Sequence, residues 1–287
     1  MNILEKDMIV VLRQLKEEHG VFQIKAEFEA EGSRMEEMMR LKDITSSVGL
    51  PIILKIGGVE AITDIYNALS IGVDGIIAPM AETPFAVGKY LNAIEKYVAD
   101  DNRSDIEFAV NIETITAFEK LDQIFELPKL NYLKGITVGR VDLTGSMGYG
   151  RDMIDDEILL EICRKIFRKA KERSLKKGLG GGISLNSIDF IKKLRAESLV
   201  DKFETRKIVF KADSIMGNIE KGILKAVEFE LLWLQSKRRY YSRIKVEDES
   251  RIAMLEKRLM SHNIVDNMRT RVNITKKRAM QKISVVR

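Results

Sequence analysis

Short apolar runs alternate with amphipathic stretches along most of the chain. The runs are rich in Ile, Val and Phe and mostly lack strict apolar–polar alternation, which is typical of parallel strands covered on both faces. The stretches between them, such as 34–49 and 157–175, carry apolar residues at helical spacing. We predict strands over these segments: 21–29, 51–57, 75–80, 107–113, 135–142, 177–184 and 202–210.

Repeated strand–helix units predict an α/β fold with a parallel sheet and right-handed crossovers. Two architectures fit this number of strands, a doubly wound sheet and a (β/α)₈ TIM barrel. No G-x-G-x-x-G opens a helix after the first predicted strand, which disfavours a dinucleotide-binding sheet. An eighth strand would have to come from the N-terminus, but residues 8–20 have a helical pattern. We therefore predict a barrel whose first strand is atypical or missing.

The pattern becomes continuously helical after residue 213. It begins with an apolar stripe that ends in Leu231, Leu232 and Trp233, and then turns basic. We predict a long C-terminal helical extension. The predicted domains are a barrel (1–212), C-terminal helices (213–260) and a basic tail (261–287).

Composition and charge change this picture in one respect. The 287 residues include 48 Lys and Arg and 43 Asp and Glu, a formal charge of +5. Residues 236–287 hold 15 basic and 5 acidic residues, a net of +10, so the remaining 235 residues carry 33 basic and 38 acidic residues, a net of −5. The basic character thus belongs to an appendage, and the body is acidic.

The same composition excludes several classes of protein. With 45% hydrophobic residues the chain can form a large core, which excludes wholesale disorder. No apolar run reaches the roughly 20 residues of a membrane helix, and the first residues do not resemble a signal peptide. A single cysteine, Cys163, excludes an internal disulfide, and two distant histidines leave little for a histidine metal cage. We expect a cytoplasmic protein.

Chemistry in a parallel barrel sits where the strands end, so the residues at those positions are the candidates. Glu113 and Asp142 follow neighbouring strands, and two carboxylates with no nearby His or Cys suit Mg²⁺. Both acids could instead cap helices or lie in solvent. Lys55, inside an apolar strand, needs an anionic partner or a lowered pKa.

Two further features at the strand ends are open to more than one interpretation. The run Gly180–Gly181–Gly182 could face an oxyanion or allow tight packing. Arg206 is a weaker candidate, because its strand alternates charged and apolar residues. Some of those charges could simply face outwards.

Three motifs in order resemble the HpcH/HpaI aldolase and citrate lyase β-subunit family. They are IGVDGIIAPMAETPFAVGKYLNAI, NIETITAFEKLDQIF and GITVGRVDLTGSMG, and the resemblance extends over roughly residues 20–210. It implies a barrel of the phosphoenolpyruvate/pyruvate-binding type that makes or breaks a C–C bond next to a carbonyl. By motif, Glu113 and Asp142 would hold Mg²⁺ or Mn²⁺, and amides of the Gly145–Ser146 loop would hold the carboxylate of a 2-oxo acid such as pyruvate or oxaloacetate.

Two departures from the family pattern matter. Members usually carry an Arg where this chain has Lys55, and many use a His near the end of the strand that here reads KAEFEAEG. Glu27 and Glu29 occupy that region, so the acid–base group would be a Glu or a water on the metal. We therefore expect catalytic roles for Lys55, Glu29 and Glu27, and a specialised lyase or the reverse condensation.

Alternatives from other classes remain open. Gly181 and Arg206, as substrate-binding residues, together with Lys55 would also suit a phosphorylated substrate such as phosphoenolpyruvate. A non-catalytic binding or regulatory barrel is a third possibility, motivated by the absent His. We expect a homo-oligomer formed through the C-terminal helices and no membrane partner. The tail lacks a recognised nucleic-acid motif, which disfavours nucleic acid.

Overall fold

Eight strands form a closed barrel in this computed structural model, which describes residues 1–260. Neighbouring strands from the first to the seventh run parallel, and the eighth runs antiparallel to both of its neighbours. The predicted TIM barrel is therefore confirmed. The strands are β1 (Val21–Glu27), β2 (Ile52–Lys55), β3 (Gly75–Ala78), β4 (Glu107–Ile112), β5 (Leu133–Gly139), β6 (Lys176–Gly180), β7 (Lys202–Glu204) and β8 (Ile208–Lys211).

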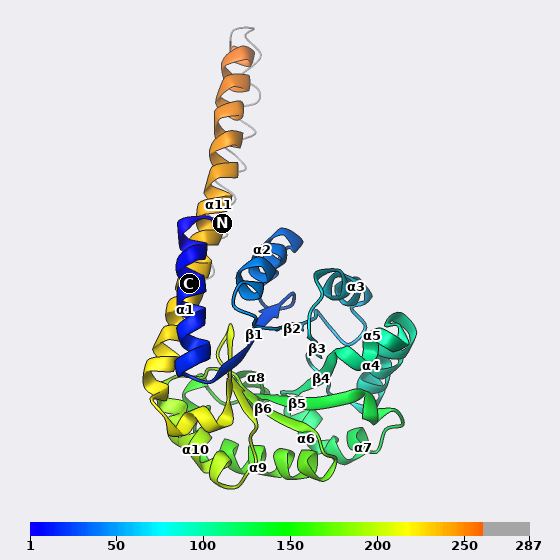
Figure 1. Ribbon diagram of the computed structural model, residues 1–287. Coiled ribbons are helices and arrows are strands. Elements are labelled where there is room, and N and C mark those ends of the chain that lie inside the picture. Colours follow the sequence, from blue (N-terminus) through cyan, green and yellow to red (C-terminus); the bar gives the residue numbers. More distant parts are fainter. Residues whose placement is uncertain (261–287) are drawn as a thin grey trace. The chain divides into compact units, whose positions relative to one another are not determined.

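Helices connect most of these strands. They are α1 (Ile3–Glu18), α2 (Met35–Ser46), α3 (Ile62–Ile71), α4 (Pro84–Tyr97), α5 (Asp100–Asp105), α6 (Ile115–Glu119), α7 (Leu121–Phe125), α8 (Arg140–Ser146), α9 (Glu157–Glu172), α10 (Ile188–Ala196) and α11 (Ile219–Met260). Short 3₁₀ turns are η1 (Leu130–Tyr132), η2 (Arg151–Met153), η3 (Leu185–Ser187) and η4 (Ala212–Met216). Figure 1 shows helices such as α3, α4 and α9 around the outside of the strands.

The prediction of an atypical or missing first strand is corrected by the way the barrel closes. The N-terminal segment is helical, as predicted, but β1 follows it and is a regular first strand. The eighth strand comes from the predicted strand 202–210, which is a hairpin of β7 and β8. Thr205 turns the chain: its amide donates to the Ile208 carbonyl at 2.9 Å, and its hydroxyl accepts from the Ile208 amide at 3.2 Å. No Gly, Pro or Asn marks this turn in the sequence.

Local sequence signals position the helices. Thr83 caps α4, its hydroxyl accepting from the Ala86 amide at 3.1 Å, and Pro84 occupies the first helical position. Gly72 ends α3 with a positive φ of 68°, which frees the chain to turn into β3. Cys163 lies on the buried face of α9. These elements hold the strand ends in register.

Two faces of the sheet carry different chemistry. Outward residues of the strands, such as Ile24, Leu54 and Ile76, pack against the helices in one large core. Inward residues form a separate small apolar cluster of Ile53, Ile77, Ala109 and Val209, with Phe22 packed against it. Because side chains alternate along a strand, residues two positions further on share the inward face. The barrel interior therefore continues from apolar residues into the polar side chains at the strand ends.

The chain divides into two units, the first of which is Met1–Leu234 and the second of which begins at Gln235. The first turns of α11 belong to the barrel unit, where Ile223, Phe229 and Trp233 are buried in its core. In the second unit the described residues 235–260 continue α11 with mostly exposed side chains. The predicted basic tail, 261–287, lies outside the described residues. No helix within residues 1–260 is both long and apolar enough to cross a membrane.

Candidate active site

Glu113 directly follows β4 and is held by its neighbours inside the mouth of the barrel. It is only 2% exposed. The Met80 amide donates to Oε1 at 2.9 Å, and the Asn111 side-chain amide donates to Oε2 at 3.0 Å. A Cβ at Gly139 would overlap the Glu113 carboxylate, so glycine there makes room for it. Burial raises the pKa of Glu113 above its ordinary value.

Asp142 faces the same region from the next strand end. The predicted strand 135–142 ends at Gly139, and its last three residues instead open α8. Asp142 is exposed in the first turn of that helix, where a negative charge is favoured. Its charge contributes to the raised pKa of Glu113, so the two carboxylates lie within electrostatic reach.

Lys55, Glu27 at the end of β1 and Glu29 in the loop that follows form an ionic cluster near Glu113. The Lys55 ammonium lies 2.6 Å from Glu29 and 3.7 Å from Glu27. Glu27 also pairs with Lys25 at 2.9 Å, and Lys25 pairs with Glu204 at 2.7 Å. Burial opposes ionisation of Glu27, but the surrounding cations hold its pKa below its ordinary value. The structure thus brings Lys55, Glu27 and Glu29 together and gives Lys55 the anionic partner that its position requires.

Arg206 lies at the tip of the β7–β8 hairpin, at the same end of the barrel. Its guanidinium is half exposed and stands 3.9 Å from Glu27 and 3.7 Å from Glu230 of α11. The next residue, Lys207, is buried, pairs with Glu31 and lies 5.5 Å from the centre of the Trp233 ring. The turn that closes the barrel therefore carries two cations to the strand ends.

Gly145 and Ser146 lie in the last turn of α8. The Ser146 hydroxyl accepts from the Ile115 amide at 2.8 Å and donates to the Leu143 carbonyl at 2.7 Å. It therefore fastens α8 to the start of α6. Gly145 is exposed, with open space where a Cβ would be.

Gly181 is required by packing. Its φ is +78°, and a Cβ there would lie 2.5 Å from the Arg140 nitrogen and 2.7 Å from the Val141 nitrogen. Both contacts are with backbone, which cannot move aside. Tight packing of β6 on the start of α8 accounts for this glycine.

Arg140 is a functional-site neighbour that sequence reasoning missed. It is completely buried and lies over the Phe190 ring at 4.9 Å. Its guanidinium donates to the carbonyls of Gly180, Gly181 and Ile154, to Ser187 and to Asp155. These bonds tie the loops after β5 and β6 to the helix that carries Asp142. An arginine in the apolar stretch GITVGRVDL was the signal available in the sequence.

The donor set suits a hard divalent cation bound with few protein ligands. Within residues 1–260 no group of three or more His, Cys, Asp or Glu side chains could hold a metal. Two carboxylates, Glu113 and Asp142, are the arrangement that Mg²⁺ accepts when water and substrate complete its shell. The residues present therefore fit Mg²⁺ or Mn²⁺ bound by two protein carboxylates together with water and substrate, and do not form a complete set of protein ligands.

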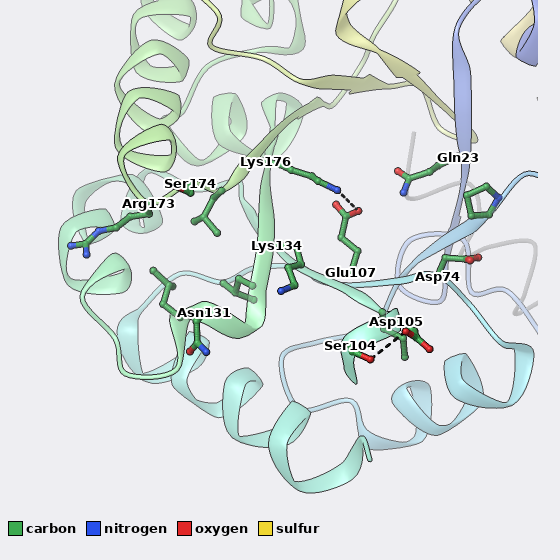
Figure 2. A pocket seen from close by; sticks show the side chains of 15 residues that line it. Gln23, Asp74, Ser104, Asp105, Glu107, Asn131, Lys134, Arg173, Ser174 and Lys176 are labelled. Atoms are coloured by element: carbon green, nitrogen blue, oxygen red, sulfur yellow. Dashed lines mark hydrogen bonds and ion pairs between the residues drawn. The ribbon is translucent and has the colours of Figure 1, made fainter. Parts of the chain in front are cut away.

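A cavity of about 770 Å³ lies at the opposite, amino end of the barrel. Figure 2 shows Gln23, Asp74, Glu107, Lys134 and Lys176 around it. Lys176 pairs with Glu107 at 3.1 Å. None of the site residues predicted from the sequence lines this cavity.

Solved structures of low sequence identity share the fold. An HpcH/HpaI aldolase from Desulfitobacterium hafniense DCB-2 is 14% identical, with a TM-score of 0.54 over 69% of this chain and 80% of that one. The citrate synthase SbnG is 17% identical, with a TM-score of 0.54 over 67% and 88%. An HpcH/HpaI aldolase/citrate lyase family protein from Burkholderia cenocepacia J2315 is 13% identical, with a TM-score of 0.52 over 76% and 98%.

No match is found among curated protein sequences. The profile of one family matches residues 18–180, more than half of the chain, including β1 to β6 and both candidate carboxylates. The chain therefore belongs to the HpcH/HpaI aldolase/citrate lyase family, whose members are enzymes of the carbon–carbon lyase type.

Proposed function

We propose that this enzyme is a divalent-metal-dependent lyase or aldolase that acts on a 2-oxo acid such as pyruvate or oxaloacetate, or catalyses the reverse condensation. The observation that carries the proposal is the pair of carboxylates, Glu113 and Asp142, which follow the neighbouring parallel strands β4 and β5 at the carboxyl end of a barrel of this family. Members of the family generally depend on a divalent metal.

Glu113 and Asp142 would hold Mg²⁺ or Mn²⁺. When bound, the ion would orient the 2-oxo acid and stabilise the negative charge of its enolate. Glu113 is prepared for this role, because both of its oxygens already accept a hydrogen bond that fixes the carboxylate. Burial raises the pKa of Glu113 because it disfavours the charged carboxylate. A cation bound beside it would offset that cost.

Lys55 is the candidate for neutralising charge that develops on the substrate oxygen. Its ammonium is held by Glu29 and Glu27, and a lysine offers one point charge in place of the fork of an arginine. Arg206, half exposed and loosely held at 3.9 and 3.7 Å, is the candidate for the substrate carboxylate. Gly145, Ser146 and Gly181 would shape the rim of the site.

Glu29 is the better candidate for proton transfer, because its side chain is 29% exposed whereas that of Glu27 is 5% exposed. For condensation, the carboxylate takes a proton from the methyl carbon of pyruvate. That carbon then forms a bond to an aldehyde carbon, and the aldehyde oxygen gains a proton. Cleavage runs through the same steps in reverse.

Calorimetric titration with Mg²⁺ in the presence of pyruvate or oxaloacetate tests the site. We expect Glu113→Gln and Asp142→Asn each to lower the metal affinity by at least about tenfold. Glu107→Gln, at the amino end of the barrel, is the matched control and should leave it unchanged. Unaltered metal affinity in the first two variants would remove the site assignment.

The proposal includes a homo-oligomer formed through the C-terminal helix. On the first turns of α11, Leu224, Val227, Leu231 and Leu234 are more than half exposed, opposite the face that packs into the barrel. Of the predicted stripe, Leu231 is exposed and Trp233 is buried in its own barrel. Light scattering should detect an oligomer that Leu231→Glu weakens, and a monomer for the unaltered chain would contradict this part of the proposal.

A further inference from the structure

The cations at the carboxyl end of the barrel are already engaged by carboxylates. Lys25 lies between Glu27 and Glu204, and Lys55 lies between Glu27 and Glu29. The two cations of the closing hairpin are held in the same way, as Arg206 stands between Glu27 and Glu230 and Lys207 pairs with Glu31. A substrate anion that enters here must compete with a protein carboxylate for every one of these four cations.

The loops that follow the strands add further negative charge. Apart from the cations of the closing hairpin, the basic residues of these loops are Arg34 and Arg151, and both share their loops with acids. Glu29 and Glu31 are the partners of Lys55 and Lys207 described above. The further acids are Glu60, Glu82, Asp152, Asp155 and Asp156, of which Glu60 pairs with Lys89 and Asp155 pairs with Arg140. A divalent ion held by Glu113 and Asp142 would cancel only the charge of its own two ligands. The region around it would remain negative.

Such a field discriminates between substrates by charge. One carboxylate can be held by the divalent ion, but a second anionic group would meet the carboxylates that already hold Lys25, Lys55, Arg206 and Lys207. Placing like charges close together costs several kcal/mol when water is excluded. The negative potential therefore disfavours substrates that carry a second anionic group.

Resting on the proposed function, we infer that the electrophile joined to, or released from, the pyruvate enolate carries no negative charge. Pyruvate with an uncharged aldehyde fits this site. A phosphorylated electrophile or an anionic aldehyde does not.

Glu230 is the residue that this inference makes testable. It stands on α11, outside the strand ends, and its carboxylate lies 3.7 Å from the Arg206 guanidinium. Removing its charge leaves Arg206 with Glu27 alone, at 3.9 Å. The variant removes one negative charge beside Arg206, so a second anion meets less repulsion there, and Glu230 should set part of the discrimination.

The experiment begins with pyruvate and Mg²⁺ in deuterated water, where exchange of the methyl protons reports formation of the enolate. The enzyme then receives glycolaldehyde or glyoxylate, two aldehydes of similar size of which only glyoxylate is anionic. We expect kcat/KM to favour glycolaldehyde by at least about tenfold. If neither aldehyde is converted, the two can be compared by the concentration of each that slows the exchange of the pyruvate methyl protons.

Glu230→Gln should shift this ratio towards glyoxylate by about threefold or more. Glu228→Gln, on the same helix and paired with Lys225 at 3.4 Å, is the matched control and should leave the ratio unaltered. If kcat/KM of the unaltered enzyme with glyoxylate equals or exceeds that with glycolaldehyde, the inference is overturned and the proposed function still stands. Absence of proton exchange with any divalent metal removes both.

Discussion

The two ends of the barrel carry opposite surpluses of charge around one apolar layer. At the carboxyl end, carboxylates outnumber the buried lysines that they hold. At the amino end, a second cavity of about 510 Å³ shares Glu107 and Lys176 with the cavity of Figure 2. It is lined by Lys171, Lys176, Lys177, Lys202 and Lys211 against only Glu107 and Asp201. Helices in a parallel barrel end at the amino side, where their dipoles favour cations. The last turn of α9 shows this directly, since it carries Lys169 and Lys171.

This difference indicates that the cations at the amino end stabilise the fold, whereas the charged residues at the carboxyl end belong to the candidate active site. The amino-end surplus offsets the helix dipoles. At the carboxyl end Glu113 itself is buried, and this burial disfavours its charge. Changes made in pairs, one at each end, can break or sharpen this contrast.

The largest effect is expected from removing a buried lysine. Lys25→Met leaves Glu204 without its ion-pair partner inside the barrel and should cost about 3–5 kcal/mol of unfolding free energy. Lys176→Met removes a lysine whose side chain is 60% exposed, and Glu107 keeps Lys202, so the cost should stay below about 1 kcal/mol. Urea unfolding measures both. Equal losses would show that the two ends do not differ in this way.

Activity should separate the ends almost as strongly. Glu113→Gln should reduce metal-dependent exchange of the pyruvate methyl protons by about 10²–10³-fold, because it removes charge aimed at the developing enolate. Glu107→Gln should leave the rate within about twofold, because the amino end of a barrel serves stability. A large loss of rate in Glu107→Gln would place chemistry where we assign none.

Backbone packing provides the third comparison. Gly181→Ala meets the backbone of α8 and should cost about 1–3 kcal/mol from overpacking in addition to the strain of its positive φ. Gly72→Ala, at the amino end, has a similar φ of 68° but open space around it, so only the strain of about 1 kcal/mol is expected. Thermal unfolding measures the difference, and a cost no larger at Gly181 would contradict the packing explanation.

The smallest effect is the pH dependence of stability. The cations around Glu27 and Glu107 outweigh burial and lower their pKa values. Each carboxylate therefore stabilises the fold above the unfolded pKa, and this contribution is lost as the pH falls through the folded-state pKa. Replacing either with Gln should make stability less sensitive to acid.

Glu113 should behave in the opposite way. Its pKa is raised by burial, so its ionisation penalises folding above the unfolded pKa, and the penalty disappears as the pH falls. Without metal, Glu113→Gln should therefore be more stable than the unaltered protein at pH 7 and equal to it in acid. Urea unfolding over this pH range checks both signs. A destabilised Glu113→Gln variant at pH 7 would show that its hydrogen bonds outweigh its burial.

The sequence anticipated the barrel and most of its strands because local patterns carry that information. Buried parallel strands are apolar runs, and caps such as Thr83 and Gly72 mark where helices begin and end. The motifs around Glu113 and Asp142 could be recognised for a similar reason, since Glu113 directly follows β4 and Asp142 lies in the first turn of the helix that follows β5.

Other features depend on residues that are distant in the sequence. The sequence could not reveal that Lys25 pairs with Glu204, that Arg140 binds the loop after β6, or that a turn at Thr205 supplies the eighth strand. The pattern of apolar residues along a strand indicates only which residues of that strand are buried. It does not indicate which distant residues they contact. Barrel closure then decides which charges meet, because a buried charge must find its partner among whatever side chains the closed sheet brings to the same end.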